Sequence, residues 1–509
     1  MEGSGVGDDF LMEIQVGPYV LRGHQTRIIG GCREAAVDGV RKMVIQAPCG
    51  FGKTIVALGI ISRILSKEGS VLVLADTRQL VYQLRNKLSE CGIPHAVLMA
   101  GEEYRHSNVT IASKQTMWSR CYTKQSTPKP AADVVIVDEA HKSLSKDWQS
   151  ILADYPAAFV IGLSATPEGV GGYYEKILVG GTYEELTPEF LTPCRVFAPY
   201  TVDMKGVPIR KGEYVSKHAQ KQFNTDPLVG DIFENWKKIA PDRPTVIFAS
   251  GVDHSIHLCE VFNARGIPAA HVDASTPQRS TPSKVGREDI FDDLRHGRIQ
   301  VVCNVRVCDV GWDEPSVSCG VLAFSTLSLV RYMQTCGRLF RTFKGKEDAV
   351  LIDHGGNVAR HGWPTSDIEY ELNPQRKLEE RLAEERESGP VMELHCPSCG
   401  YVWPKGKSAT VCPCCGAEKV RRGFPKKVLD GDLKEVIRVQ APPKTREQKQ
   451  WDRCVGVSAN LKGGSARQAR LFFFRETGKW PNRNLRNWLG HDASHSDTST
   501  VFDKYRRGR

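Results

Sequence analysis

The sequence predicts an α/β protein with two tandem domains, each built around a parallel β-sheet, followed by a cysteine-rich segment and a basic C-terminal region. Continuous apolar runs alternate with helical stretches over residues 43–163, and the same alternation returns over residues 245–353. Strands that are apolar throughout are typical of parallel sheets covered by helices on both faces. Two C-P-x-C-G sequences and an excess of lysine and arginine distinguish the rest of the chain.

Length and composition indicate a soluble protein of several domains. The 509 residues have room for about three or four domains. Hydrophobic residues make up 40% and charged residues 25% of the chain, which is ordinary for globular proteins. No apolar run approaches the roughly 18 residues needed to cross a membrane, and the N-terminus lacks a basic and apolar signal. We therefore expect a cytoplasmic protein with no membrane partner.

The first domain, predicted over residues 1–185, contains a loop suited to binding phosphate. Between a strand at residues 43–45 and a helix over residues 55–65 lies the sequence Ala47-Pro48-Cys49-Gly50-Phe51-Gly52-Lys53-Thr54. Backbone N–H groups and the helix N-terminus would face the anion, and Gly50 and Gly52 permit its close approach. Lys53 can reach the phosphates, and Thr54 can hold Mg²⁺. Ala47 stands where the common pattern has its first glycine, so a simple turn is the alternative.

An acidic pair follows one of the later strands of this domain. Further strands are predicted at residues 71–75, 109–112, 134–137 and 159–163. Asp138 and Glu139 stand at the carboxyl end of the strand 134–137, the edge at which parallel sheets bind ligands. Asp138 would hold Mg²⁺ and Glu139 would orient and deprotonate a water molecule. Two acids can also begin a solvated loop, but an apolar strand and an upstream Lys53 favour the catalytic interpretation.

The second domain, predicted over residues 186–370, repeats the strand pattern without a phosphate loop of its own. Its strands are expected at residues 245–248, 269–272, 299–303, 319–324 and 349–353. Between the last two lies a stretch in which Gln334, Arg338 and Arg341 would share one face of a helix. Solvated arginines are the ordinary alternative, although Gly337 would let a partner approach closely.

These motifs, taken in order, resemble those of superfamily 2 helicases of the DEAH-box kind. The matching residues are Arg22 and Gln25, the phosphate loop, Asp138-Glu139-Ala140-His141, Ser164-Ala165-Thr166 and the Q-x-x-G-R-x-x-R sequence from Gln334 to Arg341. The resemblance implies two RecA-like domains with ATP and Mg²⁺ bound between them. It also implies a nucleic-acid-stimulated ATPase acting as a motor.

Individual roles follow from the same resemblance. It gives Gln25 a contact with adenine and makes Arg338 and Arg341 arginine fingers. Thr110 and Gln115 become candidates near the nucleic-acid backbone. Gly311-Trp312-Asp313-Glu314-Pro315 is similar to the family's G-F-D-x-P sequence, although Asp309 and Val310 stand where relatives carry a hydroxyl group. The implied nucleotide contacts also include Arg22, Pro48, Cys49, Phe51, His141, Gly311, Asp313 and Gln334.

The C-terminal third contains a predicted structural zinc site. A charged linker helix is expected over residues 371–392, exposed to solvent, and a zinc ribbon over residues 393–420. Two C-P-x-C-G turns, 12 residues apart, each direct two thiolates toward one ion. The predicted Zn²⁺ ligands are Cys396, Cys399, Cys412 and Cys415. Cys414 could replace Cys415.

The last predicted region, residues 421–509, is basic. Residues 417–509 contain 22 Lys/Arg against 10 Asp/Glu, a surplus of 12, whereas the chain as a whole carries +10. Arginines flank the run Phe472-Phe473-Phe474, which would either stack on bases or form the core of a small domain. The cysteine pairs and the Gly-Lys-Trp-Pro sequence at residues 478–481 resemble the bacterial RadD group of DNA repair helicases.

We therefore expect an ATP-dependent DNA helicase or translocase that acts on single-stranded or branched DNA. Single-strand-binding or repair proteins are possible partners, in a nucleoid-associated cytoplasmic location. The alternatives are a translocase that remodels DNA complexes without separating strands, an RNA helicase, and the motor subunit of a restriction system. An inactive binding platform is disfavoured because Lys53, Asp138, Glu139 and Arg341 are all present.

Overall fold

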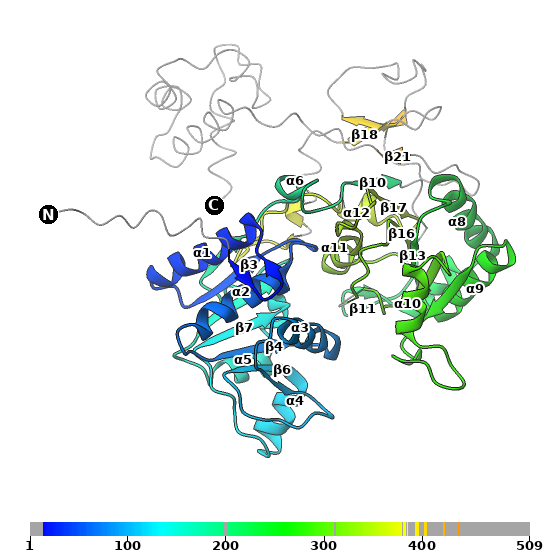
Figure 1. Cartoon of the computed structure of the whole chain (residues 1–509). Helices are drawn as coiled ribbons and strands as arrows, with labels where there is room; N and C mark the ends of the chain where they lie inside the picture. Colours follow the sequence, from blue (N-terminus) through cyan, green and yellow to red (C-terminus); the bar gives the residue numbers. More distant parts are fainter. Residues whose placement is uncertain are drawn as a thin grey trace, which may run out of the picture. The chain divides into compact units, whose positions relative to one another are not determined.

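The computed structural model describes residues 14–197, 202, 204–309, 312–378, 380–382 and 384, together with four short strands at residues 392–395, 402–404, 421–422 and 435–436. Two seven-stranded sheets with their helices form a first and a second lobe (Figure 1), which confirms the predicted α/β class with two parallel sheets. The four proposed zinc ligands and almost all of the basic C-terminal region lie outside the described residues. Within the described part of the chain, no helix has both the length and the apolarity to cross a membrane.

The first lobe has the sheet order β5-β6-β4-β7-β8-β3-β9, with every pair parallel. Its strands are β3 (Lys42–Gln46), β4 (Val71–Ala75), β5 (Ala96–Leu98), β6 (Val109–Ser113), β7 (Val134–Asp138), β8 (Phe159–Ser164) and β9 (Lys176–Val179). Its main helices are α1 (Gly23–Val37), α2 (Lys53–Leu65), α3 (Arg78–Glu90), α4 (Lys114–Met117) and α5 (Lys146–Leu152).

The second lobe has the order β14-β15-β13-β16-β17-β10-β21, and only β21 runs antiparallel to its described neighbour. Its strands are β10 (Cys194–Phe197), β13 (Thr245–Ala249), β14 (Ala269–Val272), β15 (Val301–Asn304), β16 (Cys319–Ala323), β17 (Ala349–Asp353) and β21 (Glu435–Val436). Its main helices are α8 (Asp226–Ile239), α9 (Val252–Ala264), α10 (Arg287–Arg295), α11 (Leu329–Cys336) and α12 (Asn357–His361).

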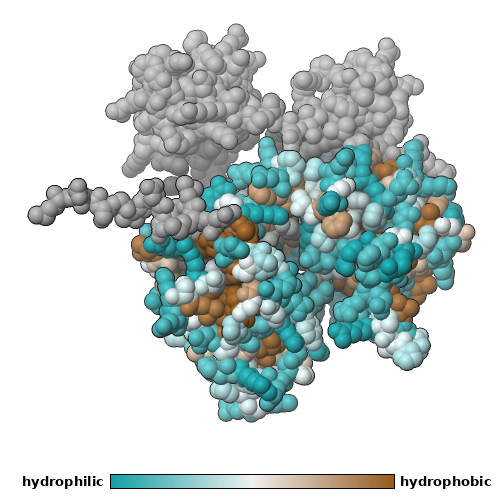
Figure 2. Space-filling view, viewed as in Figure 1, coloured by the Kyte–Doolittle hydropathy of each residue, from teal (hydrophilic) through white to brown (hydrophobic). Residues whose placement is uncertain are grey.

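Burial on both faces of the sheet explains why these strands are continuous apolar runs. All five residues of β4 are buried, and successive side chains point to opposite faces of a strand. Val71 and Val73 therefore join one hydrophobic cluster, whereas Leu72 and Leu74 join another on the opposite face. Each such side chain contributes about 1.5–3 kcal/mol on burial. In the view of Figure 2 the outer surface of the described residues is mostly hydrophilic, with apolar patches on the first lobe.

A small folded segment precedes the second sheet, in a stretch that carries no clear sequence pattern. It consists of β11 (Ile209–Arg210), β12 (Glu213–Tyr214) and α7 (Ser216–Phe223). Val202, Met204, Val207, Ala219 and Phe223 form a hydrophobic cluster of their own beneath it. Residues 204–223 are called the hairpin–helix segment below.

The chain returns to the first lobe after α12, through residues 363–382, called the return segment below. The amides of Gly169 and Gly171 donate to the carbonyls of Glu371 (2.9 Å) and Leu372 (2.7 Å). Arg381 pairs with Glu168 at 2.7 Å and with Glu371 at 2.5 Å. Residues 371–382 differ in part from the predicted solvent-exposed linker helix, because Arg381 is fixed to the first lobe, whereas Glu371, Arg376 and Lys377 are exposed as predicted.

The expected zinc ribbon is represented only by short strands among the described residues. β18 (Met392–His395) pairs antiparallel with β19 (Val402–Pro404) and with β20 (Arg421–Arg422).

Candidate nucleotide site

The phosphate loop connects β3 to α2 in a shape that requires its glycines. Gly50 has φ 90°, and Gly52, the residue that caps α2, has φ 90° and ψ 40°. A Cβ atom on Gly50 would lie 2.7 Å from Leu191 Cδ2, and one on Gly52 would lie 2.4 Å from Gln25 Nε2. Neither position accepts a side chain, so both must be glycine. The loop leads into the N-terminus of α2, where backbone N–H groups and the helix dipole favour an anion.

Gln25 holds this loop from the side of α1. Its Nε2 donates to the carbonyl of Phe51 (2.9 Å), and its Oε1 accepts from the amide of Arg22 (3.0 Å). The amide of Phe51 donates to the carbonyl of Pro48 (3.1 Å), and the Phe51 ring is buried. The side chain of Gln25, 3% exposed, thus supports the phosphate loop directly, while its expected contact with adenine stays a prediction.

The acidic pair lies at the end of β7. Asp138 Oδ1 accepts from the Glu139 amide (3.0 Å), and Glu139 has the left-handed φ of 53°. Desolvation and the neighbouring Glu139 carboxylate raise the pKa of Asp138 to about 6, and Lys53 opposes this rise. A divalent cation would stabilise the ionised form of Asp138. Lys53 acts electrostatically on Asp138, and Thr54 follows Lys53 at the start of α2. A carboxylate, an ammonium group and a hydroxyl, the groups that suit a magnesium–nucleotide complex, are thus present on the elements of this site.

A histidine connects the acidic pair to the next strand. His141 Nδ1 lies 3.2 Å from Ser164 Oγ and 3.4 Å from Glu139 Oε2. Ser164 Oγ also accepts from the amide of Thr166 (3.1 Å). Desolvation lowers the pKa of His141, so its ring is neutral at pH 7. His141 thus joins two sequence motifs within the first lobe.

The second lobe contacts this site through α11 and the turn after it. Gln334 Nε2 donates to Glu139 Oε2 (3.1 Å). A Cβ atom on Gly337 would lie 2.1 Å from the Cβ of Cys49, so the phosphate loop packs directly on this glycine. The amide of Thr192 donates to the carbonyl of Phe340 (2.8 Å). The structure therefore brings the motifs of the two lobes together.

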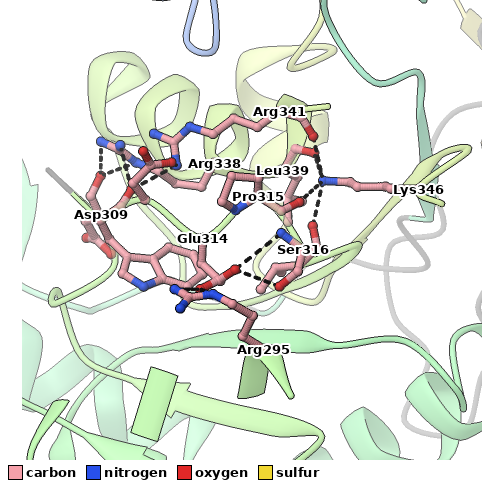
Figure 3. A network of polar contacts seen from close by, with 12 residues as sticks. Arg295, Asp309, Glu314, Pro315, Ser316, Arg338, Leu339, Arg341 and Lys346 are labelled. Atoms are coloured by element: carbon pink, nitrogen blue, oxygen red, sulfur yellow. Dashed lines mark hydrogen bonds and ion pairs between the residues drawn. The ribbon is translucent and has the colours of Figure 1, made fainter. Parts of the chain in front are cut away.

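The two arginines of this turn contact the loop that follows β15 (Figure 3). Arg338, 8% exposed, donates from Nε and Nη2 to the carbonyl of Asp309 (3.3 and 3.2 Å) and from Nη1 to that of Trp312 (3.1 Å). Arg341 Nη1 donates to the same Trp312 carbonyl (3.0 Å) and pairs with Asp313 (2.9 Å). Arg341 Cγ lies 3.8 Å from the place that a Cβ on Gly50 would occupy. Both arginines hold the loop, and Arg341 adjoins the phosphate loop; Gly311 lies outside the described residues.

One residue that supports the site, Lys346, is not part of any sequence motif. Lys346 Nζ donates to the carbonyls of Pro315, Val317, Leu339 and Arg341, at 3.2, 2.7, 2.8 and 3.0 Å (Figure 3). Desolvation and the charge of Arg341 lower the pKa of Lys346 to about 8. An isolated lysine in a polar stretch gives no indication that it will bond to four backbone carbonyls, two of them in a loop about 30 residues earlier in the chain.

The two residues expected near nucleic acid, Thr110 and Gln115, differ in their exposure to solvent. Thr110 is 1% exposed within β6, so its side chain is not open to a ligand in this structure, and its place near the nucleic-acid backbone stays a prediction. Gln115 is exposed at the end of the same strand, where its Nε2 donates to the carbonyl of Asp76 (2.8 Å). Lys142, which the sequence did not single out, donates to Asp76 Oδ2 (2.7 Å).

Two family models match the two lobes. A model described as "Type III restriction enzyme, res subunit" matches residues 18–169, and one described as "Helicase conserved C-terminal domain" matches residues 228–343.

Similar proteins come from phages, archaea and bacteria. A 51.5 kDa protein of a Lactococcus phage is 25% identical over 87% of this chain and 94% of its own length. The DNA 3'-5' translocase XPB2 of Sulfurisphaera tokodaii is 22% identical over 62% of this chain and 77% of its own length. The solved fragment of a putative HsdR subunit of a type I restriction enzyme from Vibrio vulnificus covers 70% of this chain and 67% of its own, with 18% identity and a TM-score of 0.52, and shares the fold.

Proposed function

Because the chain belongs to the superfamily 2 helicases and is an ATP-dependent nucleic-acid motor, we propose that it hydrolyses ATP between its lobes to move along DNA. The observation that carries the proposal is the contact from Gln334 to Glu139 (3.1 Å), beside the packing of Gly337 on the phosphate loop. Residues of both lobes thus share one site, so nucleotide bound there would couple hydrolysis to lobe movement.

Bound ATP with Mg²⁺ would supply the phosphoryl group that is transferred to water. The loop amides and Lys53 would bind its phosphates, and Thr54 and Asp138 would hold the metal. Glu139 orients the attacking water and takes its proton, and Gln334 fixes the direction of that carboxylate. Arg341 exchanges its contacts with Trp312 and Asp313 for the developing charge on the phosphate. Arg338 keeps the loop of Trp312 in place and acts as a support.

DNA is the proposed track. The type III restriction model over the first lobe and the relative named as a DNA translocase both support DNA. The motor subunit of a restriction system is the second candidate, favoured by the same model. Membership of the RadD group, a role in DNA repair with single-strand-binding or repair proteins, and a nucleoid-associated location are further parts of the proposal, supported by the C-terminal resemblance alone.

ATPase assays with single-stranded DNA, duplex, fork and RNA test the proposal. Lys53→Ala and Glu139→Gln should each lower stimulated turnover by about 100-fold or more, because each removes a positioned charge from the site. Lys67→Ala, an exposed lysine beyond α2, is the matched control. Turnover like that of the unchanged protein in either site variant would refute the assignment.

Strand displacement separates the remaining mechanisms. A motor that opens duplexes releases a labelled strand from a fork, whereas a translocase only displaces streptavidin from a biotinylated DNA end. If RNA stimulates the ATPase and DNA does not, RNA takes the place of DNA as the proposed track.

A structural Zn²⁺ is also proposed, held by Cys396, Cys399, Cys412 and Cys415. The support is the repeated C-P-x-C-G sequence in a segment too short for a core of its own. One zinc ion per chain is expected from elemental analysis of reduced protein, and a metal content near zero would refute the site. If the variant Cys415→Ser still binds one zinc ion per chain, Cys414 is the fourth zinc ligand in its place.

A further inference from the structure

The hairpin–helix segment, residues 204–223, belongs to neither of the matched motor regions. One family model ends at residue 169 and the other begins at residue 228. The segment is nevertheless a folded unit, since its hairpin and α7 pack on the cluster that contains Val207, Ala219 and Phe223. It is therefore an addition to the second lobe that needs its own explanation.

Its contacts place the segment at the carboxyl edge of the second sheet. Glu213 accepts from the amide of Leu327 (3.0 Å) through Oε1 and from the Thr326 hydroxyl through Oε2, just after β16 ends. Gln220 Nε2 donates to Asp253 Oδ2 (2.6 Å), at the start of the helix that follows β13. Ligands of parallel sheets bind at this edge.

The charge of the segment is strongly positive. Residues 204–223 contain five Lys/Arg and a single acid, Glu213, which is engaged by the second lobe. Lys211 (φ 52°) and Gly212 (φ 73°) form the tight turn of the hairpin and leave Arg210 and Lys211 exposed at its tip. Lys217 and Lys221 are exposed on α7, four residues apart and hence on one face.

These four cations have no ion pair among the described residues. Elsewhere on the second lobe Arg265 pairs with Glu234 (2.9 Å), and Arg298 pairs with two aspartates. Like charges four residues apart destabilise a helix unless an anion lies between them. The arrangement is thus suited to a polyanion with regularly spaced charges.

We propose that the hairpin–helix segment binds the phosphate backbone of the nucleic-acid strand on the second lobe. The inference rests on the proposed function, because it supplies that motor with a further contact to its track. Arg210 and Lys211 contact phosphates from the hairpin tip, and Lys217 and Lys221 contact neighbouring phosphates from α7.

The same segment is connected to the nucleotide site. Glu213 holds Leu327, two residues before α11 begins, and α11 carries Gln334 to Glu139. A nucleic-acid strand bound by the hairpin would therefore act on α11, and α11 carries the Gln334 side chain that orients the Glu139 carboxylate. This connection gives a structural route by which nucleic acid stimulates ATP hydrolysis.

Salt titrations of the full chain with labelled single-stranded DNA test the inference. The variants are Arg210→Gln with Lys211→Asn, which keeps a residue tolerant of the left-handed turn, and Lys217→Gln with Lys221→Gln. The control, Lys67→Gln with Lys237→Gln, also removes two exposed lysines, both at the opposite, amino edge of the sheets.

Each lost phosphate contact should lower the slope of log K against log salt by about 0.7, or about fivefold in affinity at 0.1 M salt. Each pair variant should therefore bind about 25-fold more weakly, with basal ATPase unchanged, whereas the control stays within about twofold. Binding by both pair variants equal to that of the control would overturn the inference. Absence of nucleic-acid binding by the unaltered protein would instead overturn the proposed function.

Discussion

A single glycine determines how closely the two lobes meet. Gly337 has φ −61° and ψ −15°, which alanine adopts freely, but its missing Cβ would lie 2.1 Å from the Cβ of Cys49. Gly337→Ala must therefore separate the phosphate loop from the turn that carries Arg338 and Arg341. Because displacements near 1 Å cost catalysis about 100-fold, we predict a fall in kcat of at least about tenfold.

Stimulated ATPase rates measure this effect. Gly31→Ala in α1 is the control, since a Cβ there meets nothing within 4 Å. Adding Cys49→Gly to Gly337→Ala removes the opposing Cβ and should restore part of the rate. A normal kcat for Gly337→Ala would mean that the two residues are not in contact during turnover.

Two buried histidines predict sensitivity of the second lobe to acid. Desolvation lowers the pKa of both His254 and His354 to about 3, and their side chains are 0% and 1% exposed. The unfolded chain binds their protons near pH 6.5, so their contribution to stability is present above that pH and is lost as the pH falls toward 3. At pH 5.5 each should destabilise the lobe by about 1.4 kcal/mol.

Urea unfolding at pH 7.5 and at pH 5.5 measures this loss. Replacing His254 by Gln should flatten the dependence on pH, even if stability at pH 7.5 falls. His95, half-exposed in the first lobe, gives the control substitution, His95→Gln. An equal dependence on pH in His254→Gln and in the control would show that buried histidine is not the cause.

The site motifs were predictable from local sequence, but their partners were not. The spacing of Gln334, Arg338 and Arg341 predicts one helical face, whereas α11 ends at Cys336 and the next residues form a 3₁₀ turn. Gln334, still within α11, bonds to Glu139, whereas Arg338, in the 3₁₀ turn, bonds to the carbonyl of Asp309. Backbone carbonyls of a distant loop leave no pattern in the sequence, so these roles emerge only from the fold.

At the level of elements, the return segment yields a third prediction. Arg381, 14% exposed, joins Glu168 and Glu371, and Glu168 follows the Ser164-Ala165-Thr166 sequence closely. Arg381→Ala leaves Glu168 partly buried without its partner, which should cost about 1–3 kcal/mol and loosen the segment. Hydrogen exchange at Gly169 and Gly171, whose amides bond to it, should become faster.

Arg376→Ala is the matched control, because the pair of Arg376 with Glu384 is more than half exposed on both sides. Such pairs contribute about 0–1 kcal/mol. Equal exchange rates in the two variants would show that Arg381 does not fix the segment.

Elements with strong periodicity were predicted well, and short or irregular ones were not. All five expected strands of the first sheet exist, but β5 and β9 have only three and four residues and were missed. Every residue of β9, at the sheet edge, is half-exposed or exposed, so the strand lacks a buried apolar run. The charge-rich composition of residues 371–382 predicts solvent exposure, yet Arg381 and Glu168 neutralise each other on docking.

The charge distribution of the whole molecule gives the fourth prediction. Residues 438–509 contain 16 Lys/Arg against 6 Asp/Glu, a surplus of 10. Deleting them leaves β21 and both lobes, so basal ATPase should persist. Affinity for single-stranded DNA should fall, and the slope of log K against log salt should become shallower by about 0.7 for each lost phosphate contact.

Replacing Arg467, Arg470 and Arg475 together by Ala should reproduce part of this loss if these arginines meet nucleic acid. If the slope of log K against log salt is unchanged in the deletion variant, the C-terminal region does not bind nucleic acid, and docking of another protein becomes its proposed role.

The return segment has a mechanical consequence for the motor. Among the described residues, the chain passes from the first lobe to the second near residues 187–193, comes back near residues 363–372, and reaches the second sheet again at β21. A body tied to another at one point can turn about three axes, but a body tied at two separate points turns freely only about the line through them. We therefore expect lobe movement driven by ATP to be mainly an opening and closing about the line through these two connections, with sideways rotation restricted by the return segment.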